Sequence, residues 1–239
     1  MKKGILIGGI VALTVSLLGC NSNKKAFNIS EDLYDNLNTA YNITDSLASD
    51  IYDVWFLVIY DEDELASGGC EYLASNLGVS EDAVKDAVAY AANGQFVDFS
   101  NSWHMAEGST EFQSKKDSWD EMTEDEKNEY RNIADRLIEN HVDDRLNFCV
   151  DIVYGLYSID DSIEVAQSSL DQAREQLKEL SEKYSDYEFY PALREYYTTT
   201  NSFFEYSTNV SGTFEQAQTT INDYRNEVHD HKSDLEFMF

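Results

Sequence analysis

Apolar residues recur along this chain at alternating spacings of three and four, the repeat expected of amphipathic helices that pack together. The first such helix is predicted to begin at Ser30, a good N-cap that is followed by Glu31 and Asp32. Its apolar stripe is formed by Leu33, Leu37, Ala40, Thr44, Leu47, Ile51, Val54 and Val58. Residues 54–60 are apolar on every side, so we expect them to be deeply buried. A short strand is the alternative for this run, but the unbroken repeat that leads into it favours a helix.

Helix caps predict where two further helices begin. Ser80 should start a shorter helix that ends near Asn93 and Gly94. Thr123 and Glu126 have the spacing of a capping box. From this box one helix can run to about residue 157.

The repeat restarts near Asp160 or Asp161 and is carried by Ile163, Ala166, Leu170, Ala173, Leu177, Leu180 and Tyr184. Pro191 fits the first turn of a last helix. The inner face of that helix is predicted to hold Leu193, Tyr197, Thr200, Phe204, Phe214, Ala217, Ile221, Tyr224 and Val228. The expected fold is therefore all-α, an elongated antiparallel bundle of about four long helices with a short extra helix and an aperiodic insertion.

The insertion, residues 95–122, has no clear period and is long for a bundle connection. Long aperiodic connections are often functional. Its aromatic residues are predicted to contact a ligand or partner, and the candidates are Phe96, Phe99, Trp103 and Trp119. The alternative is that these rings plug one end of the bundle.

The first twenty residues have the form of a secretory leader. Lys2 and Lys3 precede an apolar stretch over residues 4–18, which is too short for a comfortable membrane span. The stretch closes with Leu17, Leu18, Gly19 and Cys20. This leader resembles that of a bacterial lipoprotein, in which the signal peptide is removed before the Cys, and the thiol and the new amino terminus are acylated.

The resemblance covers the leader alone, and it implies a location as well as a modification. Residues 1–19 would be removed, Cys20 would carry the lipid, and the protein would be anchored on the extracytoplasmic face of the cell membrane. An uncleaved amino-terminal anchor is the alternative. Residues 20–29 are predicted to be a lipidated tether, and residues 30–239 a single helical domain, because no Pro- or Ser-rich linker divides them.

Charge excludes several kinds of partner. The 239 residues include 46 Asp and Glu but only 17 Lys and Arg, which gives a formal charge of −29. Such a surface repels phosphate backbones and anionic lipid headgroups, so we expect no binding to nucleic acid. Residues 26–84 contain no Lys or Arg at all. With 42% hydrophobic residues and one proline, the chain can nevertheless build a core of long helices.

Cys70 and Cys149 are the two cysteines that the lipid does not use. An even pair outside the cytoplasm could form a disulfide, and the alternative is two buried thiols. If the chain ran as one helix from residue 123, the two sulfurs could meet only if residues 71–122 first carried the chain back along the bundle.

The motifs of common enzymes and metal sites are missing from the sequence. It contains no phosphate-binding Gly loop, no G-x-S-x-G and no H-E-x-x-H. Residues 61–64 are acidic but do not match a calcium-binding loop. His229 and His231 would point to different sides of a helix, so they cannot both bind one ion. We therefore predict a non-enzymatic protein without a metal or cofactor.

The function that these features favour is a membrane-anchored binding module for a cationic protein, peptide or envelope component. Two alternatives stay open. One is a structural spacer or assembly component of the envelope. The other is a solute-capturing module with an aromatic pocket between helices, lined by Trp103, Trp119 or Tyr197.

Overall fold

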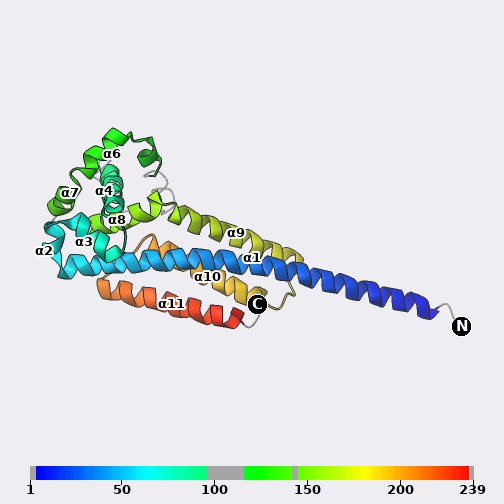
Figure 1. The fold of residues 1–239 in the computed structure, drawn as a ribbon. Helices are drawn as coiled ribbons and strands as arrows, with labels where there is room; N and C mark the ends of the chain where they lie inside the picture. Colours follow the sequence, from blue (N-terminus) through cyan, green and yellow to red (C-terminus); the bar gives the residue numbers. More distant parts are fainter. Residues whose placement is uncertain (1–3, 96–115, 142–144, 237–239) are drawn as a thin grey trace.

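The computed structural model describes residues 4–95, 116–141 and 145–236, and every regular element in these ranges is an α-helix. Helix α1 covers Gly4–Tyr60, and its side chains are described from residue 24 onward. The helices form an elongated body (Figure 1). The all-α prediction is thus confirmed.

Four long helices form an antiparallel bundle. Alongside α1 run α9 (Ser162–Lys183), α10 (Tyr190–Ser207) and α11 (Phe214–Glu236), with α9, α10 and α11 alternating in direction (Figure 1). The predicted stripe of α1 is confirmed, because its residues from Leu33 to Val54 are buried and Val58 is partly buried. The bundle core joins Leu33 and Leu37 to Leu170 of α9, Leu193 of α10 and Val228 of α11, among others.

A group of shorter helices, which we call the head, lies at the end of the bundle where α1 stops (Figure 1). In the described residues it contains α2 (Glu62–Ala66), α3 (Gly69–Leu77), α4 (Glu81–Gln95), α6 (Glu124–Arg131), α7 (Ala134–Asn140) and α8 (Arg145–Ile159), and residues 116–121 are helical as well. Helix α4 begins after Ser80, whose hydroxyl accepts a hydrogen bond from the Ala83 amide at 3.1 Å, as the sequence predicted.

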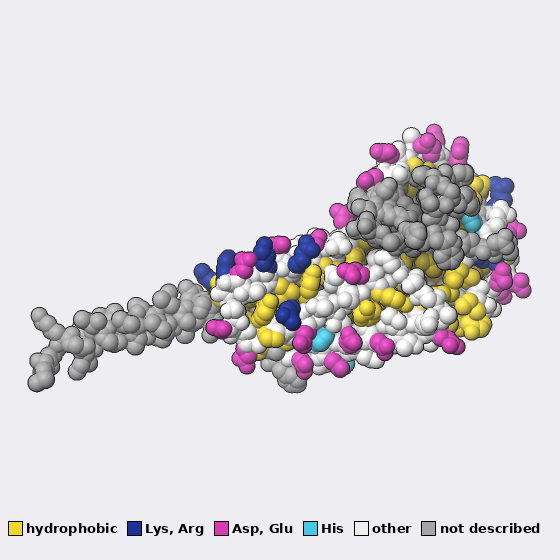
Figure 2. Space-filling view, turned by 180° about the vertical axis from the view of Figure 1, so that it is seen from behind, with side chains coloured by type: hydrophobic (Ala, Val, Ile, Leu, Met, Phe, Trp, Pro, Cys, Tyr) yellow, Lys and Arg dark blue, Asp and Glu magenta, His cyan; other side chains and the backbone are white. Residues whose placement is uncertain are grey.

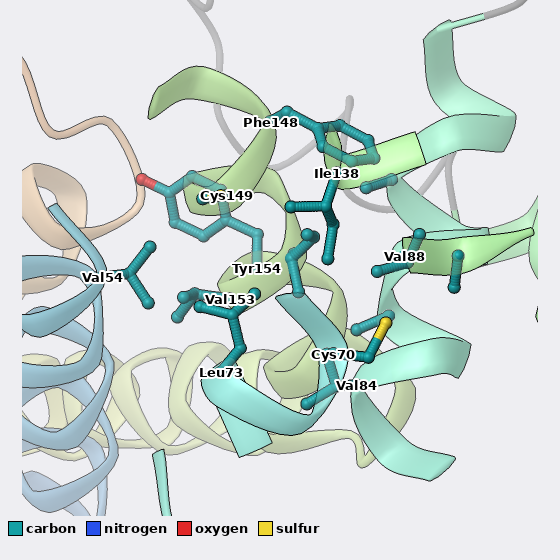
Figure 3. Packing of buried hydrophobic residues seen from close by; sticks show 14 of the residues in the cluster. Val54, Cys70, Leu73, Val84, Val88, Ile138, Phe148, Cys149, Val153 and Tyr154 are labelled. Carbon is teal, nitrogen blue, oxygen red and sulfur yellow. The ribbon is translucent and has the colours of Figure 1, made fainter. Parts of the chain in front are cut away.

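The head has its own apolar core. Figure 3 shows Val54 of α1 facing side chains from α3, α4, α7 and α8, including Leu73, Val88, Ile138 and Phe148. Glycine at position 155 lets α8 approach α4 closely, since a Cβ there would lie 3.0 Å from the carbonyl oxygen of Ala87. The last turns of α1 therefore join the two regions.

The predicted start of the first helix at Ser30 is wrong. Helix α1 continues through this position, and the buried Ser30 hydroxyl donates to the Ala26 carbonyl oxygen at 2.8 Å instead of capping a terminus. Ala26 is also buried in the bundle core. Packing therefore begins inside the segment that the sequence assigned to a tether.

The single helix expected from Thr123 to residue 157 is three helices. The Thr123–Glu126 capping box is confirmed at the start of α6, but the chain bends after Arg131. Helix α7 is held against α3, because the Cys70 amide donates to the Asp135 carboxylate at 3.0 Å. Tertiary contacts to α3 thus accompany the break in the local repeat.

The last predicted helix is also divided. Residues 208–213 reverse the chain between α10 and α11, with Gly212 at a φ of +104°. A second capping box starts α11: the Thr213 amide donates to the Gln216 side-chain oxygen at 2.9 Å, and the Gln216 amide donates to the Thr213 hydroxyl at 3.3 Å. This turn completes the four-helix bundle.

The expectation that all of residues 54–60 are buried is wrong for three side chains. Val54 and Leu57 enter the head core, but Phe56 is 43% exposed, Ile59 47% and Tyr60 62%. At this end α1 packs on the head along one side and on the start of α11 along another. The remaining side faces solvent.

Candidate functional site

Trp119 is the described member of the predicted contact residues, and it is a core residue. It is 5% exposed and packs edge-on against Tyr90 of α4, with ring centroids 6.4 Å apart. This burial favours the alternative, in which the aromatic rings plug one end of the bundle, over a ring that is open to a ligand. Phe96, Phe99 and Trp103 lie outside the described residues, so their predicted role stays a prediction.

Lys127 covers the ring of Trp119, a contact that the sequence analysis missed. Its Nζ lies 4.3 Å from the ring centroid, a cation–π geometry, and 3.8 Å from a carboxylate oxygen of Glu124. Trp119 and Lys127 are eight positions apart in the sequence, and α6 begins between them. No helical spacing therefore predicts their contact. Trp119 is thus held between an aromatic ring and an ammonium group.

Beside this cluster lies a surface pocket of about 350 Å³ lined by Met122, Glu126, Glu129, Tyr130 and Ile133. Glu126 is already engaged, because its carboxylate accepts hydrogen bonds from the amide and hydroxyl of Thr123 at 2.8 and 2.7 Å. These bonds lower the pKa of Glu126 below its ordinary value of 4.5. Glu129 and Tyr130 supply the other polar atoms of the pocket lining.

Cys70 and Cys149 are free thiols, both buried in the head core (Figure 3). The disulfide that the sequence left open is not formed, and the pair is the alternative of two buried thiols. Burial raises the pKa of Cys149 to about 12. Burial, with the Asp135 carboxylate nearby, also raises the pKa of Cys70. Neither sulfur is a reactive thiolate at neutral pH.

Eight bases in the described part of the chain form ion pairs with the protein's own acids. The bases in ion pairs are Lys85, Lys116, Lys127, Arg131, Arg145, Arg174, Lys183 and Arg225. Arg145 is the most buried of them, 5% exposed, and donates to the Glu62 carboxylate at 2.8 Å. Since acids far outnumber bases, much of the acidic surface has no internal counter-charge (Figure 2).

The acidic run at residues 61–64 and a histidine of α11 contact other parts of the protein. Asp61 precedes α2 and accepts a hydrogen bond from the Tyr72 hydroxyl at 3.0 Å. Helix α11 continues through both terminal histidines, and the His231 ring nitrogen lies 3.2 Å from the Thr199 hydroxyl. Within the described ranges no group of three or more His, Cys, Asp or Glu residues is placed to hold a metal ion.

The predicted lipidation motif, Leu17, Leu18, Gly19 and Cys20, falls within the bounds of α1, but its side chains are not described. Lipidation of Cys20 therefore stays a prediction. In the part of the chain where helices are described, none is both long and apolar enough to cross a bilayer.

Comparisons with known proteins add no relative to this picture. No protein-family model matches the chain, and the searches of curated proteins and of solved structures also found no match. The leader, the charge and the exposed surface are therefore the features that bear on function.

Proposed function

We propose that this protein is a lipid-anchored binding module on the extracytoplasmic face of a bacterial membrane, with a cationic protein, peptide or envelope component as its partner. The location rests on the leader that ends in Leu17, Leu18, Gly19 and Cys20. The observation that carries the binding role is the excess of acidic side chains, since 46 Asp and Glu face only 17 Lys and Arg.

A spacer role is the second candidate, and the length of α1 favours it. The helix is continuous from Gly4 to Tyr60, so the span from Cys20 to Tyr60 is about 60 Å at 1.5 Å per residue. Solute capture is less favoured, because Trp119 is covered by Tyr90 and Lys127 and gives no open ring to a ligand.

The anchor is tested by expressing the full chain in a bacterial host with a clickable fatty acid. We expect the wild type to carry the label and to sediment with membranes, and Cys20→Ser to lose the label. Cys70→Ser and Cys149→Ser are matched controls that should keep it, because these thiols are buried. Equal labelling of Cys20→Ser and the wild type would contradict lipidation at this residue.

The partner is tested by chemical cross-linking on intact cells followed by mass spectrometry. Recovered partners should present a basic face, and their recovery should fall as salt is raised, because screening weakens contacts between exposed charges. Partners that are acidic and insensitive to salt would contradict the cationic part of the proposal.

A further inference from the structure

Exposed apolar side chains gather at one place on the described surface. Phe56, Ile59 and Tyr60 lie within two turns of α1, whereas the other large apolar residues that are well exposed, Val79 and Val165, lie on separate elements. Isolated exposed apolar residues are ordinary on a protein surface, but a contiguous group marks an interaction site.

Aromatic contacts extend this group onto α11. The ring of Phe214, the first residue of α11, stacks on Tyr52 with centroids 4.6 Å apart and lies 6.4 Å from Phe56. Phe56 in turn contacts Tyr60 at 4.6 Å. We call Tyr52, Phe56, Ile59, Tyr60 and Phe214 the tip patch.

Two rings of the tip patch, those of Tyr52 and Phe214, are held in place by neighbouring side chains. Phe214 is held between Tyr52 and the largely buried Trp55, whose centroid is 6.1 Å away. The Tyr52 hydroxyl also accepts a hydrogen bond from the Gln218 amide group at 2.7 Å. Binding of a partner to these two rings would therefore cost little side-chain conformational entropy.

Acidic residues flank the tip patch. Asp53 is exposed one residue from Tyr52, Glu62, Asp63 and Glu64 follow Tyr60, and Glu215 follows Phe214. The two stretches of chain that build the patch, residues 26–84 and 195–224, contain no Lys or Arg. Figure 2 shows hydrophobic side chains gathered at the end of the body away from the chain start, with acidic side chains beside them.

Arg145 supplies one nearby positive charge, and it does not change the sign of this surface. It pairs with Glu62 and is almost fully buried. The surface around the tip patch therefore combines an apolar centre with a negative rim.

We propose that the tip patch docks a basic amphipathic segment of the partner, an inference that rests on the proposed function and locates its binding surface. A helix with an apolar stripe between Lys or Arg residues would cover the rings and pair with the rim. A second copy of this chain would bring the same acids against each other, and an anionic bilayer would be repelled as well. An apolar patch alone could bind any of these three partners, and the acidic rim favours the cationic helix.

The test uses the full chain in phosphatidylcholine nanodiscs and a fluorescent Leu/Lys peptide of about 18 residues, which forms about five helical turns. Two further peptides are compared, one with the same composition in an order without an apolar stripe, and one with Glu in place of Lys. Anisotropy measures Kd after subtraction of the signal from empty discs. We expect the striped basic peptide to bind most tightly and to weaken as salt is raised.

Two pairs of variants locate the binding. Phe56→Ser/Tyr60→Ser should raise Kd at least about tenfold, the loss typical of central aromatic anchors. The matched control, Val79→Ser/Val165→Ser, removes exposed apolar residues elsewhere and should leave Kd within about twofold.

The second pair of variants tests the acidic rim. Asp63→Asn/Glu64→Gln should raise Kd about threefold. Its control, Glu175→Gln/Glu182→Gln, removes exposed acids on α9 and should raise Kd less.

The outcomes separate this inference from the function on which it rests. Salt-sensitive binding that the tip and control variants weaken equally would overturn the tip patch and leave the cationic-partner function standing. Failure of the wild type to prefer the basic over the acidic peptide would overturn both. A wild-type dimer that Phe56→Ser/Tyr60→Ser converts to a monomer would assign the patch to self-association and overturn the inference.

Discussion

The bundle and the head are held together in different ways. Bundle helices α9, α10 and α11 have 18 to 23 residues, and several buried hydroxyls lie among their contacts with α1. Those of Ser30 and Thr44 donate to carbonyl oxygens one turn earlier in the same helix. The head has helices of 5 to 15 residues around a core of apolar side chains. In the long helix α1, buried hydroxyls at Ser30 and Thr44 are thus satisfied within the helix, whereas the short helices of the head depend on packing between elements.

The largest effect is expected when the head core is emptied. Phe148 is fully buried and stacks on the His141 ring with centroids 4.1 Å apart. Phe148→Ala should lower the free energy of unfolding by about 3–5 kcal/mol through lost burial and a cavity. Urea denaturation followed by circular dichroism measures the change, and hydrogen exchange shows where protection is lost.

Leu37→Ala is the matched bundle variant, since Leu37 is equally buried in α1. We expect Phe148→Ala to reduce protection first in α3, α4 and α7, and Leu37→Ala to reduce it along the bundle. If both variants reduced protection evenly over the whole chain, the head and bundle would form one cooperative unit and the contrast between them would fail.

Sequence spacing predicted the bundle well because each of its helices buries one continuous stripe. The residues predicted to line α9 are buried from Ala166 to Leu180, and those of α1 behave in the same way. The break between α10 and α11 was missed, because apolar residues continue across it from Phe204 to Phe214. Gly212, followed by the Thr213–Gln216 box, was the signal that could have revealed it.

The head could not be predicted to the same extent, because its helices end where contacts between distant segments require it. Gly155 packs against Ala87, and Ile138 packs over Gly69, and no local period pairs these residues. Burial of the aromatic residues was misjudged for the same reason. Trp119 is enclosed by Tyr90 and Lys127, whereas Tyr60, in an apolar run, faces solvent.

A smaller effect of opposite sign tests how the bundle accommodates polar groups. Thr200 is buried in α10, and among the described residues its hydroxyl has no hydrogen-bond partner. Thr200→Val keeps the shape and removes this desolvated group, so it should stabilise the protein by about 1 kcal/mol. Thr44→Val is the control: it removes a hydroxyl that donates to the Ala40 carbonyl at 2.8 Å and should give no such gain. Equal effects of the two changes in urea denaturation would contradict this account.

The two capping boxes, one in each region, give a comparison of similar size. The bundle box pairs Thr213 with the uncharged Gln216, so Thr213→Ala should cost about 1 kcal/mol at any pH. In the head box the amide and the hydroxyl of Thr123 both donate to the Glu126 carboxylate. These bonds, the amide bond most of all, lower the pKa of Glu126 in the folded protein.

A carboxyl group with a lowered pKa stabilises the folded state above its ordinary value, here 4.5, and loses this contribution as the pH falls through its folded-state pKa. Thr123→Ala should therefore destabilise the protein at pH 7 and progressively less below pH 4.5, whereas the cost of Thr213→Ala should not change. Urea denaturation of both variants beside the wild type, at a series of pH values, measures the two differences. Parallel pH profiles for the two variants would show that the charge on Glu126 does not contribute to its cap.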